Sequence, residues 1–361
     1  MQAIDFIVEA AAAPAHSLAA DRHFMHAVQR ASRTRNAVMR VYSFAGDVLA
    51  LGRYHLAPTG SGGADDQPSE GVRLFRRQTG GRALPFGDGF VGLSLILPHR
   101  SALYSPDPYA LAPYQVMNRY VRGILESYKT VGVPAFYPGR DFITVDGRIL
   151  GLVSFETDEH GALLFEAVLA NTRDFSLLPK FLEAVDPAGA VKAEMLTPEA
   201  TTCLARELGT PLSVHDVAEV LQRGYAKQFP LAFEPHSYST LESQAIEAIA
   251  AREFRHDAWL RQRQMRPDLD HAATAWVQLG VFEAYYSLEQ DRFIKELIFS
   301  GDFIANSPAV ARLERDLRLC PAEWRAIDGV ASAIFSQPEN FMLGIGRVRA
   351  IADLVMRGLN Q

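Results

Sequence analysis

Cysteine is scarce in this chain, which has only two among its 361 residues. Cys203 and Cys320 lie far apart, so they can form neither a disulfide framework nor a four-ligand zinc site. The ten histidines show no HExxH or similar spacing, which disfavours catalysis by a protein-bound zinc ion. Because disulfides are rare in reducing compartments, this cysteine usage predicts a cytoplasmic protein.

Long apolar runs and an excess of positive charge are missing as well. No run of 18 apolar residues occurs, and the Met1–Ala19 segment lacks the cationic start of a signal peptide, so we expect neither a membrane span nor an export signal. The 36 Lys and Arg residues stand against 42 Asp and Glu residues, a net charge of −6, which disfavours bulk binding of nucleic acid. A Walker-type nucleotide loop is excluded, because the chain contains no GxxxxGKS or GxxxxGKT sequence.

What remains is a composition that predicts two folded domains. Hydrophobic residues make up 48% of the chain, which is enough for buried cores, and the length corresponds to about two domains. Two prolines interrupt the polar connector Phe229–Thr240 and indicate a boundary there. We therefore predict an α+β unit over residues 1–232 and a smaller α+β unit over residues 238–361. The polar, Gly-rich segment Thr59–Glu70 is expected to be a surface loop.

Hydrophobic periodicity predicts the main elements of both units. Apolar residues at helical spacing indicate a helix over Tyr109–Thr130, and Ser213 is the expected N-cap of a helix over Ser213–Phe229. Short apolar runs bounded by turn residues predict strands. The other predicted helices are Ser17–Ala31 and Leu241–Ala251, and the predicted strands include Val72–Arg76, Val91–Leu97, Ile143–Val145, Leu150–Phe155, Leu163–Leu169, Trp276–Tyr286 and Arg292–Ile298.

The most informative stretch is Arg76–Ala83, RRQTGGRA, which places three arginines around two glycines between predicted strands. Glycine lets a backbone approach a ligand closely, and guanidinium groups can bind phosphate or carboxylate through two hydrogen bonds. A hairpin turn with solvated arginines is the plain alternative. Clustered arginines repel one another unless an anion relieves them, and this favours a functional anion site.

At this stretch the sequence resembles a known family. RRQTGGRA is similar to the signature of the lipoate and octanoate branch of the biotin and lipoate protein ligase superfamily. Other segments follow in the same order as the family's motifs, so the resemblance covers nearly the whole chain. They are Leu49–His55 (LALGRYH), Gly139–Gly151 (GRDFITVDGRILG), Gly161–Leu169 (GALLFEAVL), Thr201–Gly209 (TTCLARELG) and, near the C-terminus, Trp259, Gly280 and Gly301-Asp302-Phe303.

The chain thus resembles the lipoate-protein ligase A family, with a fused C-terminal accessory domain. The resemblance implies a biotin/lipoate ligase-like α+β fold, in which mixed and antiparallel sheets are flanked by helices, plus a smaller α+β accessory domain. It also implies an enzyme that uses ATP and Mg²⁺ to convert lipoate or octanoate into acyl-AMP. The acyl group would then pass to a lysine of an apo lipoyl carrier domain, such as that of a 2-oxoacid dehydrogenase E2 or the glycine cleavage H protein.

The resemblance also assigns roles to individual residues. Arg76 and Arg77, or one of them, would meet the phosphate of the acyl-adenylate, and Gly80 and Gly81 would border the acyl chain and its adenylate linker. Glu166 lies in an apolar strand, and its carboxylate faces either this site or solvent. The complete implied site comprises Arg76, Arg77, Thr79, Gly80, Gly81, Arg82, Asp141, Gly151 and Glu166.

One expected residue is absent. Family members carry a lysine in the second hairpin, whereas this chain reads Asp146-Gly147-Arg148-Ile149-Leu150-Gly151. An ungapped match from Gly139 places the lysine on Ile149, and a match through the trailing glycine places it on Arg148. We favour Arg148 because it retains a cation, although arginine and lysine differ as hydrogen-bonding groups.

Cys203 offers a second chemistry. Octanoyltransferases of this superfamily carry the acyl group on a cysteine thiol without ATP, and a thiol activated by a nearby cation or base could do so here. A small buried residue in the sequence TTCL is the alternative interpretation. A third hypothesis is that the loss of the hairpin lysine has left a catalytically degenerate, lipoate-binding homologue.

Overall fold

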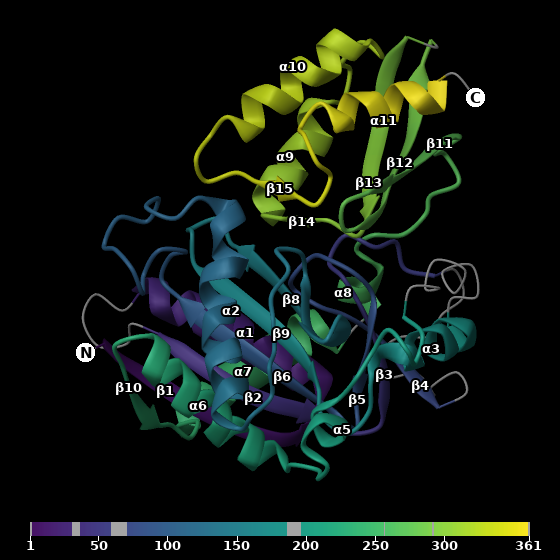
Figure 1. The fold of residues 1–361 in the computed structure, drawn as a ribbon. Coiled ribbons are helices and arrows are strands. Elements are labelled where there is room, and N and C mark those ends of the chain that lie inside the picture. The colour runs from purple at the N-terminus through teal and green to yellow at the C-terminus, as the bar shows by residue number, and fades with distance from the viewer. Residues whose placement is uncertain are drawn as a thin grey trace.

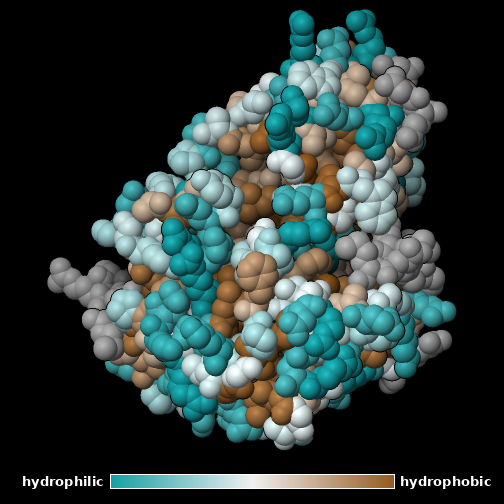
Figure 2. Space-filling view, viewed as in Figure 1, coloured by the Kyte–Doolittle hydropathy of each residue, from teal (hydrophilic) through white to brown (hydrophobic). Residues whose placement is uncertain are grey.

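The computed structural model describes residues 2–30, 37–58, 71–185, 196–255, 257–290 and 292–359. Figure 1 shows two lobes: a larger one that contains the elements up to α8, and a smaller one that contains β11 to α11. Figure 2 shows the same face in space-filling form, where the surface narrows toward the smaller lobe. The predicted loop Thr59–Glu70 lies outside the described residues.

A seven-stranded mixed sheet forms the centre of the larger lobe, in the order β10-β1-β2-β6-β9-β8-β7. Strand β1 is parallel to both β10 and β2, and the other neighbouring pairs are antiparallel. Its central strands are almost continuously apolar because both faces of the sheet are covered. The strands are β1 (Gln2–Ala12), β2 (Val38–Phe44), β6 (Phe90–Leu97), β7 (Phe142–Val145), β8 (Arg148–Thr157), β9 (Leu163–Ala170) and β10 (Leu231–Pro235).

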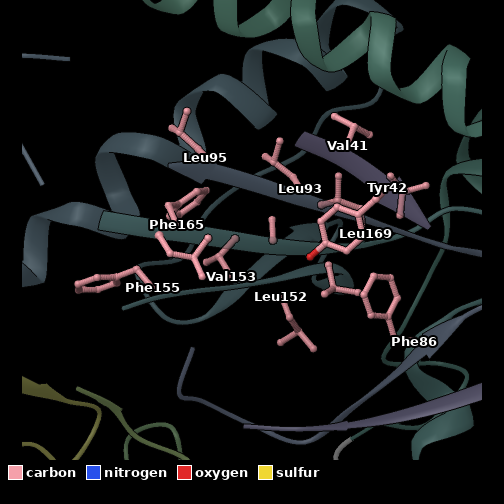
Figure 3. Close-up of a cluster of buried hydrophobic side chains, with 14 of the residues drawn as sticks. Val41, Tyr42, Phe86, Leu93, Leu95, Leu152, Val153, Phe155, Phe165 and Leu169 are labelled. Atoms are coloured by element: carbon pink, nitrogen blue, oxygen red, sulfur yellow. The ribbon is translucent and has the colours of Figure 1, made fainter. Parts of the chain in front are cut away.

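Helices α2 (Pro113–Thr130) and α6 (Val214–Gln228) cover one face of this sheet. The close approach of the two helices requires Gly224, since a Cβ there would stand 2.1 Å from Ser127 Oγ. Alternation along the strands sends neighbouring side chains to opposite faces. Figure 3 shows this directly: Val41, Leu93, Leu95, Phe165 and Val153 lie on the side of these helices, whereas Tyr42, Phe86 and Leu152 lie on the other side.

Helix α1 (Pro14–Arg30) covers the opposite face, where Asp21 contacts strands β2 and β6. Behind it lie α7 (Thr240–Ile249), a helical turn at Ala250–Phe254 and α8 (Asp257–Arg261). The domain limits 1–232 and 238–361 stay a prediction. In the structure, the side chains that follow the connector join the hydrophobic core of the larger lobe, namely Ile246, Ile249, Ala250, Phe254 and Leu260.

The larger lobe also contains a separate three-stranded sheet. Strand β3 (Asp47–Leu51) is at its centre, parallel to β4 (Val72–Arg76) and antiparallel to β5 (Leu84–Gly87). Residues 77–83 connect β4 to β5, and we call this connection the glycine turn. The short helices η1 (Phe175–Leu177), α3 (Leu178–Val185) and α5 (Leu204–Leu208) complete the larger lobe.

The smaller lobe is an antiparallel sheet covered by three helices and has its own hydrophobic core. The predicted strand Trp276–Tyr286 is in fact two strands, because the chain turns at residues 278–279. The elements are β11 (His271–Val277), β12 (Gly280–Glu289), β13 (Phe293–Gly301), β14 (Ile304–Ala305), α9 (Ser307–Asp316), α10 (Trp324–Phe335), β15 (Met342–Leu343) and α11 (Ala350–Leu359). In the described part of the chain, no helix is both long and apolar enough to cross a membrane.

Candidate functional site

The glycine turn is held against the main sheet by backbone contacts. Its residue Gly81 lies so close to Gly52 that a Cβ on Gly52 would stand 2.0 Å from the Gly81 carbonyl oxygen. On the other side, Ser154 Oγ on β8 donates to the Gly80 carbonyl at 2.9 Å. Gly81 has a φ of +85°, a left-handed conformation that favours glycine. Close packing thus explains the glycine at position 52, and backbone conformation explains the glycine at position 81.

Arg77, Thr79 and Glu166 form a buried polar cluster in this turn. Glu166 Oε2 accepts a hydrogen bond from Arg77 Nη1 at 3.1 Å and another from the Thr79 hydroxyl. Arg77 Nη2 donates to the carbonyls of Gly80 at 3.2 Å and Arg82 at 2.7 Å, while its Nε is buried without a partner. The Glu166 carboxylate therefore faces the glycine turn and not solvent.

Glu166 also belongs to a row of polar residues that crosses the apolar sheet. The strand register aligns Arg40, Ser94, Glu166 and Ser154 on one face of four neighbouring strands. Ser94 Oγ lies 2.9 Å from Asp21 Oδ2, and Tyr42 OH lies 3.5 Å from Glu166 Oε1. Burial raises the pKa of Asp21 to about 6, against the opposing effect of Arg40. A polar path thus leads from α1 to the glycine turn.

Arg82 and Asp141 form a second ion pair at the other end of the turn. Arg82 Nε donates to Asp141 Oδ2 at 2.8 Å, and the guanidinium lies 4.8 Å from the ring centre of Phe142. Burial raises the pKa of the Asp141 carboxyl, and Arg82 opposes this effect. Arg82 Nη2 and Asp141 Oδ1 are buried without hydrogen-bond partners. Both atoms are therefore able to bind a further polar group.

Arg76 is turned away from this cluster. Its fully buried guanidinium donates to five backbone carbonyls, and desolvation lowers its pKa to about 9. Because all three of its nitrogens already have acceptors, Arg76 holds chain segments together, and only Arg77 of the two adjacent arginines reaches Glu166. The acceptors are the carbonyls of Gly52, Arg53, His55, Leu260 and Arg263.

The tip of the second hairpin, at Arg148 and Ile149, lies at a distance from the glycine turn. Arg148 and Ser154 are six positions apart along the extended strand, which corresponds to about 20 Å. Arg148 Nη2 pairs with Glu207 at 3.0 Å, and Ile149 is buried, bonded through its backbone to residues 200 and 202. Gly151 packs on Leu169 and Ile143, where its missing side chain leaves room.

Cys203 is next to this second hairpin and not next to the glycine turn. It is the N-cap residue of α5, its side chain is 5% exposed, and it belongs to the hydrophobic core. The preceding residue, Thr202, donates its N–H to the Ile149 carbonyl at 2.9 Å. The structure thus brings Cys203 close to the position expected for the family lysine.

Sequence reasoning missed the contacts that the smaller lobe makes with the glycine turn. The Gly81 N–H donates to the Phe303 carbonyl at 2.8 Å. Tyr54 stacks on Phe303 with ring centres 4.5 Å apart, and its hydroxyl donates to the Ala305 carbonyl at 2.8 Å. Asp302 lies 2.9 Å from His55 and accepts a hydrogen bond from the Val281 N–H. The Gly-Asp-Phe sequence was the available signal, but nothing in it indicated a partner in the first unit.

Glu156 joins the two lobes through a helix terminus. Its buried carboxylate accepts a hydrogen bond at 2.7 Å from the N–H of Ser307, the first residue of α9, and Arg53 Nε lies 4.0 Å away. A carboxylate at a helix N-terminus is favourable because of the helix dipole. Desolvation nevertheless dominates and raises the pKa of Glu156 to about 7.

This pKa predicts a pH-dependent difference between the wild type and a Glu156→Gln variant. A carboxyl whose folded pKa exceeds its ordinary value near 4.5 is protonated more readily in the folded state. As pH rises from about 4.5 to about 7, the wild type should therefore lose stability relative to the variant, on the order of 3 kcal/mol. Urea unfolding of both proteins at several pH values measures this difference. A difference that stays constant with pH would contradict the assignment.

Comparison with known families identifies the family of the larger lobe. The model of the lipoyl protein ligase A/B catalytic domain matches residues 13–226, more than half of the chain. The chain belongs to this family. The matched segment includes the glycine turn, the Glu166 strand, the second hairpin and Cys203, whereas the smaller lobe follows it. The expected family is thereby confirmed.

Individual members of the lipoyl protein ligase family show the same relationship. The octanoyltransferase LipM of Exiguobacterium sp. is 24% identical over 274 residues, which cover 69% of this chain and 95% of that protein. The fold is shared with a bi-partite lipoate protein ligase of Thermoplasma acidophilum, at a TM-score of 0.59 and 17% identity over 74% of this chain and 99% of that one. P. falciparum LipL1, solved in complex with lipoate, covers 99% of this chain and 100% of its own, with a TM-score of 0.66 and 10% identity. The predicted α+β ligase-like fold is confirmed.

Proposed function

We propose that this lipoyl ligase family member activates lipoate or octanoate with ATP and transfers the acyl group to a lysine of a lipoyl carrier domain. The observation that supports this most is the pairing of two guanidinium groups, Arg77 and Arg82, at the two ends of one glycine turn. Each group has a buried nitrogen without a partner. Cations fixed in a buried site stabilise negative charge that develops in a reaction.

The residues of the turn are compatible with ATP and Mg²⁺. The free nitrogens, Arg77 Nε and Arg82 Nη2, are donors for phosphate oxygens, and Asp141 Oδ1 is a free carboxylate oxygen, the type of ligand that Mg²⁺ prefers. ATP would supply the adenylyl group that makes the acyl carboxylate reactive. In this proposal Arg77 and Arg82 bind and orient the phosphate, and Asp141 would hold the Mg²⁺ ion. The glycine backbone lets the acyl-adenylate approach closely.

The acyl chain would lie in an apolar slot between the two glycine-bearing hairpins. Leu152 and Val168 are paired across β8 and β9, two positions from the Ser154–Glu166 pair. They therefore lie on the same sheet face as Glu166, on the side toward Gly151. Apolar walls with a few polar groups at one end are typical of small-molecule sites. The carrier would be an E2 or H-protein lipoyl domain in the cytoplasm.

The decisive experiment incubates the protein with ATP, lipoate or octanoate, and an apo carrier domain. Formation of acyl-AMP, followed by a mass increase of the carrier, is the expected result. Absence of acyl-AMP with a properly folded protein would refute the ligase. Lipoate binding without turnover, together with activity gained by Ile149→Lys or Arg148→Lys, would instead identify a catalytically degenerate homologue.

A second candidate function is ATP-independent acyl transfer through Cys203. Its support is the position of Cys203 beside the start of β8, together with the resemblance to an octanoyltransferase. A cysteine nucleophile forms a covalent acyl intermediate. Under this alternative, Cys203→Ala should abolish transfer from an octanoyl carrier protein and remove a hydroxylamine-labile acyl adduct. Under the ligase proposal the same variant should retain ATP-dependent transfer to within about threefold, because removing one sulfur atom leaves only a small cavity.

The measurement is mass spectrometry of the protein with and without hydroxylamine, in parallel with the ATP-dependent assay. Cys320→Ala is the matched control variant, since it removes the chain's other cysteine, which lies in the smaller lobe. Undiminished ATP-independent transfer by the Cys203→Ala variant would eliminate the cysteine mechanism.

A further inference from the structure

The cluster around Glu166 has the composition of an anion site that is already filled. A buried guanidinium nitrogen of Arg77 and the hydroxyl of Thr79 both point to a single carboxylate oxygen, Glu166 Oε2. All three side chains are buried, with Glu166 only 5% exposed. Two convergent donors of this kind recognise an oxyanion, and here the oxyanion comes from the chain itself.

The hydrogen-bond inventory of Arg77 supports this interpretation. A guanidinium has five N–H donors. The Arg77 Nη1 nitrogen serves Thr79 and Glu166, and Nη2 serves the carbonyls of Gly80 and Arg82, so only the Nε donor remains unused. One donor cannot form the paired hydrogen bonds with which arginine binds phosphate or carboxylate. A ligand anion can therefore receive hydrogen bonds from both Arg77 Nη1 and the Thr79 hydroxyl only by replacing Glu166.

Glu166 has a further polar contact besides Arg77 and Thr79. Its second oxygen, Oε1, faces the hydroxyl of Tyr42 at 3.5 Å, and Ser94 Oγ lies 3.5 Å from that hydroxyl. These hydroxyls lie on the same sheet face as Glu166, on neighbouring strands. The Tyr42 hydroxyl therefore still donates to the carboxylate when Arg77 and Thr79 turn to another anion.

We propose that Glu166 is a specificity-determining residue that competes with the anionic group of the substrate for Arg77 and Thr79. The competing group is an oxyanion, either the free carboxylate of the acyl substrate or the phosphate of its adenylate. The inference rests on the proposed function for the identity of these ligands. It concerns binding alone and requires no turnover.

The test compares the wild type with Glu166→Gln in binding to three probes by calorimetry. Lipoate carries the acyl chain and a carboxylate, AMP carries the phosphate, and lipoamide carries the acyl chain without an anion. The variant should bind lipoate, AMP or both about tenfold more tightly than the wild type does, while lipoamide binding stays within about twofold. A gain for lipoate alone identifies the carboxylate as the competitor, and a gain for AMP alone identifies the phosphate.

A second readout separates competition from a structural role. Removing the Glu166 charge leaves Arg77 buried and uncompensated, so the variant should unfold at a lower temperature. If Glu166 stands in for a ligand, the probe that gains affinity should restore the melting temperature of the variant more than it raises that of the wild type. Glu314→Gln is the matched control, because it removes the carboxylate from a second arginine–glutamate pair, Arg263–Glu314, that contains no residue of the glycine turn.

The outcomes are distinct from those of the activity assay. The inference would be overturned if Glu166→Gln bound both anions equally to the wild type or more weakly. It would also be overturned if lipoamide gained as much affinity as the anions. Thermal rescue of Glu314→Gln by lipoate to the same extent would overturn it as well. Failure to form acyl-AMP refutes the proposed ligase but leaves these binding results unaffected. A Glu166→Asp variant, which keeps the charge on a shorter side chain, should bind the anions less tightly than Glu166→Gln.

Discussion

Replacing Arg77 with methionine should reduce acyl transfer by about 100- to 1000-fold, the usual effect of removing one group that stabilises charge in a transition state. Methionine preserves most of the apolar length of the side chain but none of its donors. The loss should appear mainly in kcat, since developing charge and not the acyl chain is what the guanidinium stabilises. Steady-state kinetics of carrier acylation, with ATP and lipoate varied separately, measures the effect.

This prediction needs a control because Arg77 also neutralises Glu166. The double variant Arg77→Met/Glu166→Gln removes both charges, so the buried site is left without an unpaired carboxylate. It should fold more stably than Arg77→Met alone and remain inactive. Arg206→Met is the matched surface control, since its partner Asp174 lies outside the cluster and its side chain is 47% exposed. Recovery of activity in the double variant would show that Arg77 only balances Glu166.

Arg76→Met should have the largest effect on stability, a loss of about 3–5 kcal/mol in the free energy of unfolding. Its guanidinium is fully buried and donates to five carbonyls. Two of them, Gly52 and Arg263, also accept a backbone N–H and keep that donor in the variant. The carbonyls of Arg53, His55 and Leu260 lose the donors that Arg76 supplies. Each buried acceptor left without a donor costs roughly 1–3 kcal/mol, so three of them account for a loss of this size. Urea unfolding gives the value, and Arg206→Met, which should change stability by less than about 1 kcal/mol, is again the reference.

The two adjacent arginine variants therefore separate fold from chemistry. At equal folded fractions, Arg76→Met should retain substantial activity, whereas Arg77→Met should be nearly inactive. A loss below about 1 kcal/mol for Arg76→Met would mean that its carbonyl contacts contribute little. Comparable catalytic losses in both variants, at equal folded fractions, would contradict the division of roles.

The sequence could not separate these two arginines, although it identified their motif. Alternating direction along β4 distinguishes their side chains only once the strand's neighbours are known. The acceptors of Arg76 include the Leu260 carbonyl, 184 positions away, and Glu166 is 89 positions from Arg77. Local patterns carry no information about such distant partners. The positions of both ion pairs, and the intrusion of Phe303 at the turn, therefore required the fold.

Local chemistry was enough for the elements themselves. Period-two and continuous apolar runs indicated the central strands β6, β8 and β9 to within a few residues, and Ser213 caps α6 through its hydroxyl as its position suggested. Strand β5 was missed because its four residues include a proline and end in a glycine, which are weak strand signals. The family motifs then indicated the fold into which these elements assemble, which periodicity alone cannot give.

The hydrogen bond from the Gly81 amide to the Phe303 carbonyl has a practical consequence. An amide proton that is bonded across two lobes exchanges with solvent deuterium only when the lobes separate or the turn opens. The exchange rate of this one proton therefore reports on separation of the lobes in solution. Comparing it with the exchange of the Val281 amide, which is bonded to Asp302 within the smaller lobe, would distinguish lobe separation from local unfolding.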